Sequence, residues 1–201
     1  VTDAVAQGWG VNEVVGEFST DYRPDPARDA NLVQGCARVN NHLVMPGGTF
    51  SVTDALGTVD AENGFTDAGV IVAEQHVDAM GGGLSQVGTT VFNAGFEAGM
   101  DDVEHTPHSQ YMSRYPEGRE ATIWTGQKDV KFTNSTPYAV LVQAWVSGDQ
   151  VHVRLWSTTY YTVDIETSAR TNVVDYSTTT TTGATCVPNE EGEPGFDVTV
   201  T

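Results

Sequence analysis

The hydrophobic positions of this chain follow a helical period in its first half and an alternating period in its second. Residues 25–44, DPARDANLVQGCARVNNHLV, predict a helix that begins near Asp25-Pro26, because an N-cap aspartate followed by proline is typical of a helix start. The turn residues MPGG at 45–48 predict its end. One face of this helix carries Leu32, Cys36, Val39 and Leu43.

Residues 81–99, GGGLSQVGTTVFNAGFEAG, predict a second helix that opens at a glycine turn and ends near Gly99. A face with little side chain lets the backbone of another element come close. The predicted face of this kind consists of Leu84, Gly88, Val91, Gly95 and Gly99.

Short strands are predicted on both sides of the second helix, whereas residues 1–17 show little pattern. The segments 49–57 and 69–77 come before it, and 110–115, 120–124, 129–134, 138–147 and 150–157 follow it. Ser147-Gly148-Asp149 predicts a hairpin turn between the last two segments. Helices early and strands late predict an α+β fold, with two helices packed on a mainly antiparallel sheet.

The predicted organisation is one domain over residues 1–165, followed by an extended C-terminal segment over 166–201. Residues 177–185, STTTTTGAT, are polar and of low complexity, so we expect a flexible or extended loop. The last residues, PGFDVTVT, predict the entry to a further module. Because the chain begins without methionine, we also expect it to be part of a longer, anchored protein.

The strongly negative net charge of the chain makes anionic macromolecules unfavourable binding partners. Nine Lys and Arg residues stand against 27 Asp and Glu residues, a formal net charge of −18. Such a field repels nucleic acids, anionic lipids and teichoic acids, so we expect no nucleic-acid partner. No apolar run reaches the roughly 20 residues that cross a bilayer, and no signal-peptide pattern is present, so we expect no membrane insertion within this segment.

The two cysteines, Cys36 and Cys186, permit two interpretations. In an extracellular protein they predict one disulfide, which ties the C-terminal segment to the first helix. The alternative is a pair of thiols, with Cys36 an ordinary core residue. We expect no cofactor and no metal site: His105 and His108 do not have the i, i+4 spacing of zinc peptidases, and nucleotide-binding fingerprints are missing.

Several ordered motifs carry a family resemblance between about Gly16 and Trp156. They are GEFSTDY, LVMPGGTFSV, ENGFTDAGVIV, the GGG-x-[CS]-Q-x-x-TT-x-[FY]-NA helix, HTPHS, YPEGREAT and KFTNSTPYAVLVQAWV. Together they resemble the VanW-like family of bacterial cell-envelope proteins. The resemblance implies an extracellular or surface-anchored location and work on or near peptidoglycan, without implying a particular reaction. The family often has cysteine where this chain has Ser85.

A hydroxyl at the start of a helix predicts a nucleophile if a base lies near it. Ser85 is the candidate nucleophile, with His108 as the first candidate base and His105 as the second. The amides of Ser85 and Gln86 are candidates for an oxyanion hole, and Arg119 for holding the carboxylate of a peptide stem. The full candidate ligand-binding set is Gly83, Gln86, Tyr115, Arg119 and Glu120.

Each of these candidates also has a structural interpretation. Ser85 can be a helix N-cap, and His108 can be a buried histidine bonded to backbone. Arg119 and Glu120 can pair with each other, and Tyr115 can be a core or rim aromatic. The sequence therefore leaves two functions open: recognition of a peptidoglycan-derived peptide, with or without acyl transfer, and a structural or adhesive wall module.

Overall fold

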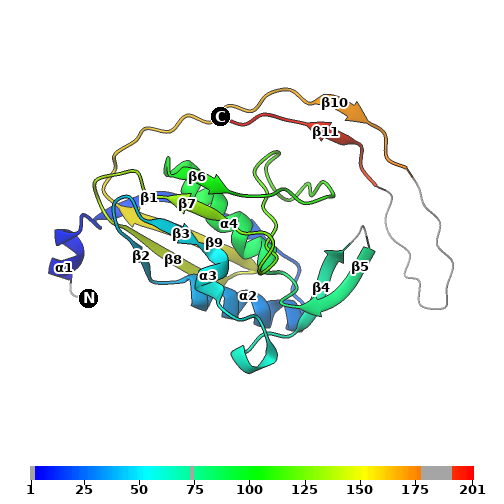
Figure 1. Cartoon of the computed structure of the whole chain (residues 1–201), viewed down its shortest axis with the longest axis horizontal. Helices are drawn as coiled ribbons and strands as arrows, with labels where there is room; N and C mark the ends of the chain where they lie inside the picture. The colour runs from blue at the N-terminus through cyan, green and yellow to red at the C-terminus, as the bar shows by residue number, and fades with distance from the viewer. Residues whose placement is uncertain (1–2, 73–74, 178–191) are drawn as a thin grey trace.

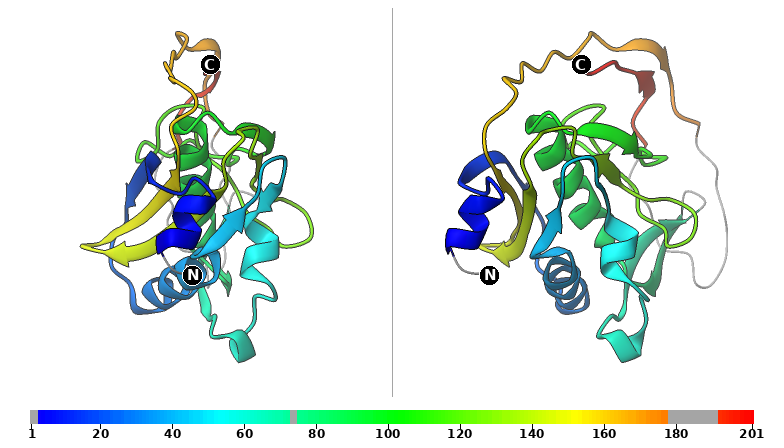
Figure 2. Two further views of the ribbon diagram at one scale, coloured as in Figure 1. Left: turned by 90° about the vertical axis from the view of Figure 1, so that its left-hand side faces the viewer. Right: turned by 60° about the vertical axis from the view of Figure 1, so that its left-hand side comes forward.

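The computed structural model describes residues 3–72, 75–177 and 192–201 (Figures 1 and 2). Its helices are α1 (Asp3–Gly8), α2 (Pro26–Val39), α3 (Val52–Leu56), the 3-10 helix η1 (Ala61–Asn63) and α4 (Leu84–Glu97). Its strands are β1 (Glu13–Asp21), β2 (His42–Val44), β3 (Thr49–Ser51), β4 (Asp67–Val72), β5 (Gln75–Met80), β6 (Asp101–Glu104), β7 (Lys131–Thr133), β8 (Val140–Ser147), β9 (Gln150–Ser157), β10 (Thr171–Val174) and β11 (Gly195–Asp197).

The main sheet has the strand order β1-β9-β8-β2, and all of its neighbouring pairs are antiparallel. Helix α2 packs on β8, and α4 packs on β1 and β9, so that both helices lie on one side of this sheet (Figure 2). The alternating pattern of β9 supplies Val151, Val153 and Leu155 to the core between sheet and helices. The predicted α+β fold with two helices on a mainly antiparallel sheet is confirmed.

Helix α4 is the centre of the fold, because it is covered on both sides. One side rests on the main sheet, where Gly16 of β1 leaves room for the carbonyl of Ala94. On the other side, Gly88 lies against Ile123 and Gly95 against the ring of Phe132 in the three-stranded sheet β3-β7-β6. The predicted glycine-rich face is therefore a close-packing face.

The sequence predictions were wrong about some boundaries. Helix α2 ends at Val39 and not near residue 44, because Asn41 turns the chain at a φ of 66° and β2 follows. Leu43 therefore belongs to a strand. In segment 49–57, only the first three residues form a strand, since Ser51 caps helix α3 by accepting a hydrogen bond from the Asp54 amide.

Other strand predictions fall on irregular chain. Residues 110–115 and 120–124 form no named strand, although Trp124 makes an isolated bridge with Lys128. Residues 121 and 123 are held by side chains of α4, and such contacts leave no pattern in the segment itself. Helices α1, α3 and η1 and strands β1, β2, β6 and β10 were not predicted, and the segment 69–77, predicted as one strand, falls on the two antiparallel strands β4 and β5. The turn between β8 and β9 is confirmed, and its positive φ angles of 58° at Gly148 and 60° at Asp149 suit a tight hairpin.

Residues 166–174 and 195–201 pair to form a C-terminal ribbon that lies above the body of the fold (Figure 1). The ribbon contacts the loop of residues 107–118. Arg170 forms an ion pair with Glu117 and lies over the rings of Phe196, at 4.1 Å, and Tyr111, at 5.2 Å. A domain boundary near residue 165 and a further module after the ribbon stay predictions.

Cys36 is buried in helix α2, and its side chain is 2% exposed. Cys186 and most of the predicted loop 177–185 lie outside the described residues, so the disulfide stays a prediction. In the described parts of the chain, no helix is long and apolar enough to cross a membrane.

Candidate functional site

Three glycines build the turn before α4, each for a different reason. Gly81 and Gly83 have φ angles of 76° and 100°, which L-residues with side chains rarely adopt. Gly82 lies so close to the carbonyl of Ala68 that a methyl group there would overlap it. Gly83 is the N-cap residue, so the interpretation of Ser85 as an N-cap is wrong. Ser85 lies one residue inside the helix, as its predicted place in the first turn requires.

The hydroxyl of Ser85 binds the main chain of the neighbouring extended segment. It accepts a hydrogen bond from the amide of Ile123 at 3.0 Å and lies 3.5 Å from the carbonyl oxygen of the same residue. One turn further along α4, the hydroxyl of Thr89 makes both bonds to Ala121, each at 3.0 Å. Ser85 thus begins a row of polar side chains that holds residues 119–123 against the helix.

The two histidines pair with carboxylates instead of with Ser85. Nδ1 of His108 lies 2.9 Å from Oε2 of Glu120, and both side chains are nearly buried. Nδ1 of His105 lies 2.6 Å from Oδ2 of Asp102. Neither imidazole is within hydrogen-bond distance of the Ser85 hydroxyl, whose bonds go to Ile123. The structure does not bring the candidate nucleophile and its candidate bases together directly.

Gln86 is fully buried, and its side chain joins three elements. Its Nε2 donates to the carbonyls of Thr20 and Asp21 and contacts the Thr20 hydroxyl, while its Oε1 accepts from Arg28 at 2.8 Å. The backbone amide of Gln86 donates to the carbonyl of Gly83 at 2.9 Å. One of the two amides of the candidate oxyanion hole is therefore already used by the helix turn.

Arg119 is buried, and its guanidinium binds two side chains of α4. Its Nε donates to Asn93 at 2.7 Å, and one Nη donates to Glu97 at 2.6 Å. Its guanidinium lies over the rings of Phe18 and Phe96, at 5.3 and 5.4 Å. Arg119 pairs with Glu97 and not with Glu120, because the extended chain directs neighbouring side chains to opposite sides. The carboxylate that it holds is an internal one.

Tyr115 presents a polar atom that the fold leaves without a partner. The residue is 4% exposed, and its hydroxyl makes no hydrogen bond within the described residues. Its ring stacks beside that of His108, with 6.3 Å between centroids, and the Arg114 guanidinium lies 4.8 Å from its centroid. Burial raises the pKa of Tyr115, whereas both the charge and the N–H donors of the nearby Arg114 guanidinium lower it. A buried hydroxyl without a partner costs about 1 to 3 kcal/mol, so it is a candidate ligand contact.

Arg28 also belongs to this site, and the sequence analysis missed it. Its side chain passes over Gly83, where an added Cβ would lie 3.1 Å from Cγ of Arg28. The guanidinium reaches Gln86 from there. One signal was available: a cation in the first turn of a helix opposes the helix dipole, and Arg28 is the third residue of α2. Such a position suggests a role outside the helix.

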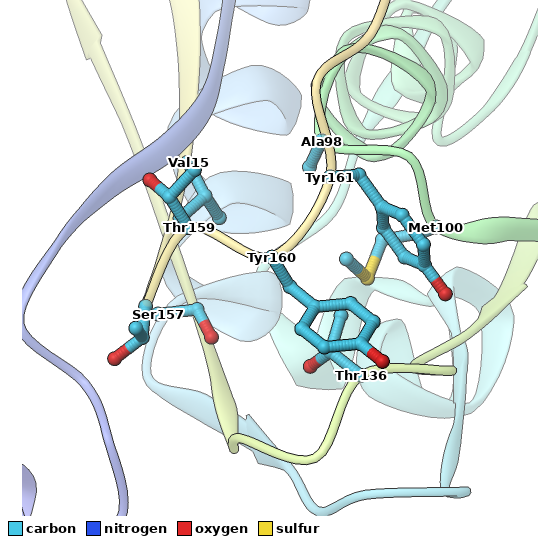
Figure 3. A pocket seen from close by; sticks show the side chains of 9 residues that line it. Val15, Ala98, Met100, Thr136, Ser157, Thr159, Tyr160 and Tyr161 are labelled. Atoms are coloured by element: carbon cyan, nitrogen blue, oxygen red, sulfur yellow. The ribbon is translucent and has the colours of Figure 1, made fainter.

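The cavity shown in Figure 3 lies at the other end of α4, beside Ala98 and Met100. Tyr160, Tyr161 and Thr136 also line it. Its volume of about 20 Å³ has room for about one water molecule. It is too small to be a peptide-binding site.

Comparison with known proteins now adds to this geometry. The family model described as "VanW like protein" matches residues 27–156, which include α4, all of α2 except its first residue, and every candidate catalytic and ligand-binding residue. The chain belongs to the VanW-like family. Membership relates it to the bacterial cell wall, and the resemblance drawn from the motifs is confirmed.

A curated relative is the uncharacterized protein YoaR of Bacillus subtilis (strain 168), which is 30% identical over 144 residues. The alignment covers 71% of this chain and 48% of YoaR, so the chain spans about half the length of this relative. No solved structure gives a significant match to the chain.

Proposed function

We propose that this VanW-like chain is an extracellular recognition domain that binds a peptidoglycan-derived peptide beside the N-terminal end of α4. The observation that carries the proposal is the buried Tyr115 hydroxyl without a partner, next to the nearly buried His108 and Glu120. A fold that needed these groups only for packing would gain by replacing the hydroxyl with hydrogen.

The His108 and Glu120 pair fixes how the imidazole meets a ligand. A carboxylate can only accept, so Nδ1 of His108 donates to Glu120. Nε2 then remains as an acceptor while the ring is neutral, and it becomes a donor when the ring is protonated. A peptide offers both N–H and C=O groups, so it can use Nε2 in either state.

Ser85 serves this proposal as part of the wall of the site. Its hydroxyl positions Ile123 and the exposed Trp124 that follows. Acyl transfer by Ser85 is a second proposal, and it needs a movement that frees the hydroxyl from Ile123 and brings the ring of His108 to it.

One observation favours the alternative of a structural or adhesive wall module. Hydrogen bonds inside the domain occupy polar side-chain atoms of three candidate residues, Ser85, Gln86 and Arg119. These contacts explain the residues without any ligand. The alternative leaves the Tyr115 hydroxyl without an explanation, so we place it second.

The experiment is titration of the purified chain with soluble muropeptides released from peptidoglycan by a muramidase, followed by calorimetry. We expect saturable binding that His108→Ala weakens at least tenfold. His152→Ala is the matched control, because His152 stacks on Trp145 in the main sheet. No heat of binding at millimolar muropeptide would refute peptide recognition and leave the structural module. Equal losses in both variants would refute the location of the site.

A further inference from the structure

The start of α4 gathers positive charge in a strongly acidic molecule. Four of its nine Lys and Arg residues form ion pairs with carboxylates among the described residues; these are Arg119, Lys131, Arg154 and Arg170. Arg28 and Arg114 have no carboxylate within ion-pair distance in the described parts of the chain. The nearest acids of α2, Asp25 and Asp29, act on Arg28 only at longer range.

Arg28 and Arg114 also lie close enough to repel each other. The pKa of Arg28 is lowered first by burial and next by the charge of Arg114. A partly buried guanidinium that faces a second cation is costly unless an anion compensates it. The only hydrogen-bond partner of the Arg28 guanidinium in the described residues is the neutral side chain of Gln86, because the bond to Asp25 is made by the backbone amide.

The end of α4 that faces Arg28 is also positive. The helix has 14 residues, and its first turn contains no acidic residue. Its N-cap, Gly83, offers no side chain to accept from the first amides. The backbone amides of Leu84 and Gln86 donate to the carbonyls of Gly81 and Gly83, but no acidic side chain in the first turn offsets the partial positive charge of the helix N-terminus.

The Tyr115 hydroxyl supplies an independent observation. It is buried and unpartnered in the described structure, and the charges of both Arg114 and Arg28 reach it. The surroundings of this hydroxyl hold two guanidinium groups and one carboxylate, that of Glu120, whose Oε2 is already bound by His108. An anion placed there would accept from the hydroxyl and both cations.

We propose that Arg28, Arg114, Tyr115 and the N-terminal end of α4 form an anion subsite whose ligand is a carboxylate. This inference rests on the proposed function, because it names the group of the peptide that is bound. A carboxylate matches the planar fork of a guanidinium and carries a single charge. Phosphate carries more charge, which the net charge of −18 disfavours. The carboxylate role that the sequence assigned to Arg119 thus moves to Arg28.

The experiment compares a synthetic stem peptide that ends in a free carboxylate with the same peptide ending in a carboxamide. We expect the acid to bind at least tenfold more tightly to the wild-type chain. Tyr115→Phe and Arg28→Gln should each reduce this ratio toward one, whereas Arg38→Gln should keep it. Arg38 is the matched control, because it lies on the same helix and binds Asn63.

The Tyr115→Phe variant separates a loss of ligand binding from a loss of folding stability. The hydroxyl makes no hydrogen bond in the described structure, so its removal should leave the Tm of the free protein unchanged or higher. Binding of the acid should nevertheless fall. A lower Tm together with unchanged binding would overturn the role of Tyr115 in the subsite.

Simple anions separate the failure of this inference from that of the proposed function. If acid and amide bind equally, the subsite is overturned and peptide recognition stands. If no peptide binds but N-acetyl-D-alanine shifts NMR signals of wild type and not of Arg28→Gln, the subsite stands and the proposed function fails. If neither binds, both fail. Inorganic phosphate binding as tightly as N-acetyl-D-alanine would overturn the choice of carboxylate.

Discussion

Asn93 and Arg119 hold each other through two hydrogen bonds of equal length. Nδ2 of Asn93 donates to the carbonyl of Arg119 at 2.7 Å, and Nε of Arg119 donates to Oδ1 of Asn93 at 2.7 Å. They form the last rung of a ladder in which helix positions 85, 89 and 93 bind extended positions 123, 121 and 119. Four helical residues rise about 6 Å and two extended residues about 6.6 Å, so the two chains stay in register.

The ladder predicts that Asn93→Ala is strongly destabilising. The change leaves the buried carbonyl and the Nε of Arg119 without a partner, and each unsatisfied group costs about 1 to 3 kcal/mol. Asn12→Ala removes a bond to Thr158 that is exposed, so it should cost about 1 kcal/mol or less. Urea unfolding measures both. Equal losses in the two variants would contradict a structural role of the ladder.

Substitution by alanine should have different effects on stability at Gly82, in the turn before α4, and at Gly69, in strand β4. In Gly82→Ala, the new methyl group meets the carbonyl of Ala68, so the turn must shift, and we expect a loss of roughly 2 kcal/mol or more in stability. Gly69→Ala in strand β4 meets nothing within 4 Å and should be neutral or slightly stabilising. Thermal unfolding compares them. A neutral Gly82→Ala would show that the turn is loose.

Ser85→Cys tests the catalytic proposal for the position where the family often has cysteine. Because His108 is bound to Glu120, we expect the pH profile of thiol alkylation at position 85 to be unchanged when His108→Ala is added. Site-resolved mass spectrometry separates this thiol from the native cysteines. Acyl transfer would be supported if the pKa of the thiol at position 85 lies well below about 8.5 in Ser85→Cys and rises back to about 8.5 when His108→Ala is added.

Intact mass decides the predicted Cys36 to Cys186 disulfide. Burial raises the pKa of the Cys36 thiol to about 12, so alkylation must be carried out on unfolded protein. We expect no alkylation without reductant and two alkylated thiols after reduction. The bridge would stabilise the fold by roughly 4 to 5 kcal/mol in chain-entropy models. Two alkylated thiols in the unreduced, unfolded chain would refute it.

Asp129 predicts a loss of stability in acid. Burial alone would raise its pKa, but hydrogen bonds from Ser51, Thr53 and Val130 outweigh this and leave the pKa below its usual 3.8. The stabilisation is therefore complete above pH 3.8 and is lost as the pH falls toward the lowered pKa. Asp129→Asn should be less stable at pH 7 and lose less on acidification. Parallel curves of unfolding free energy against pH would contradict this.

The sequence by itself determined the features that depend on local contacts. The start of α2 follows from Asp25 and Pro26, and the hairpin after β8 follows from Gly148 and Asp149. Conformational preferences of a few adjacent residues decide such features. The ordered motifs also determined the family, because they occur along one chain and need no knowledge of their positions in space.

Only the tertiary structure decided what the site residues contact. Residues 120–124 alternate like a strand, yet Ala121 and Ile123 bind side chains of α4 that lie 32 and 38 positions away. Arg119 was expected to bind a ligand, but it forms an ion pair with Glu97 inside the domain. Arg28 was not expected at the site, because it lies 58 positions in sequence from Gln86, which it contacts. Hydrogen bonding and burial between distant segments depend on how helices and sheets pack, and local sequence patterns do not encode that packing.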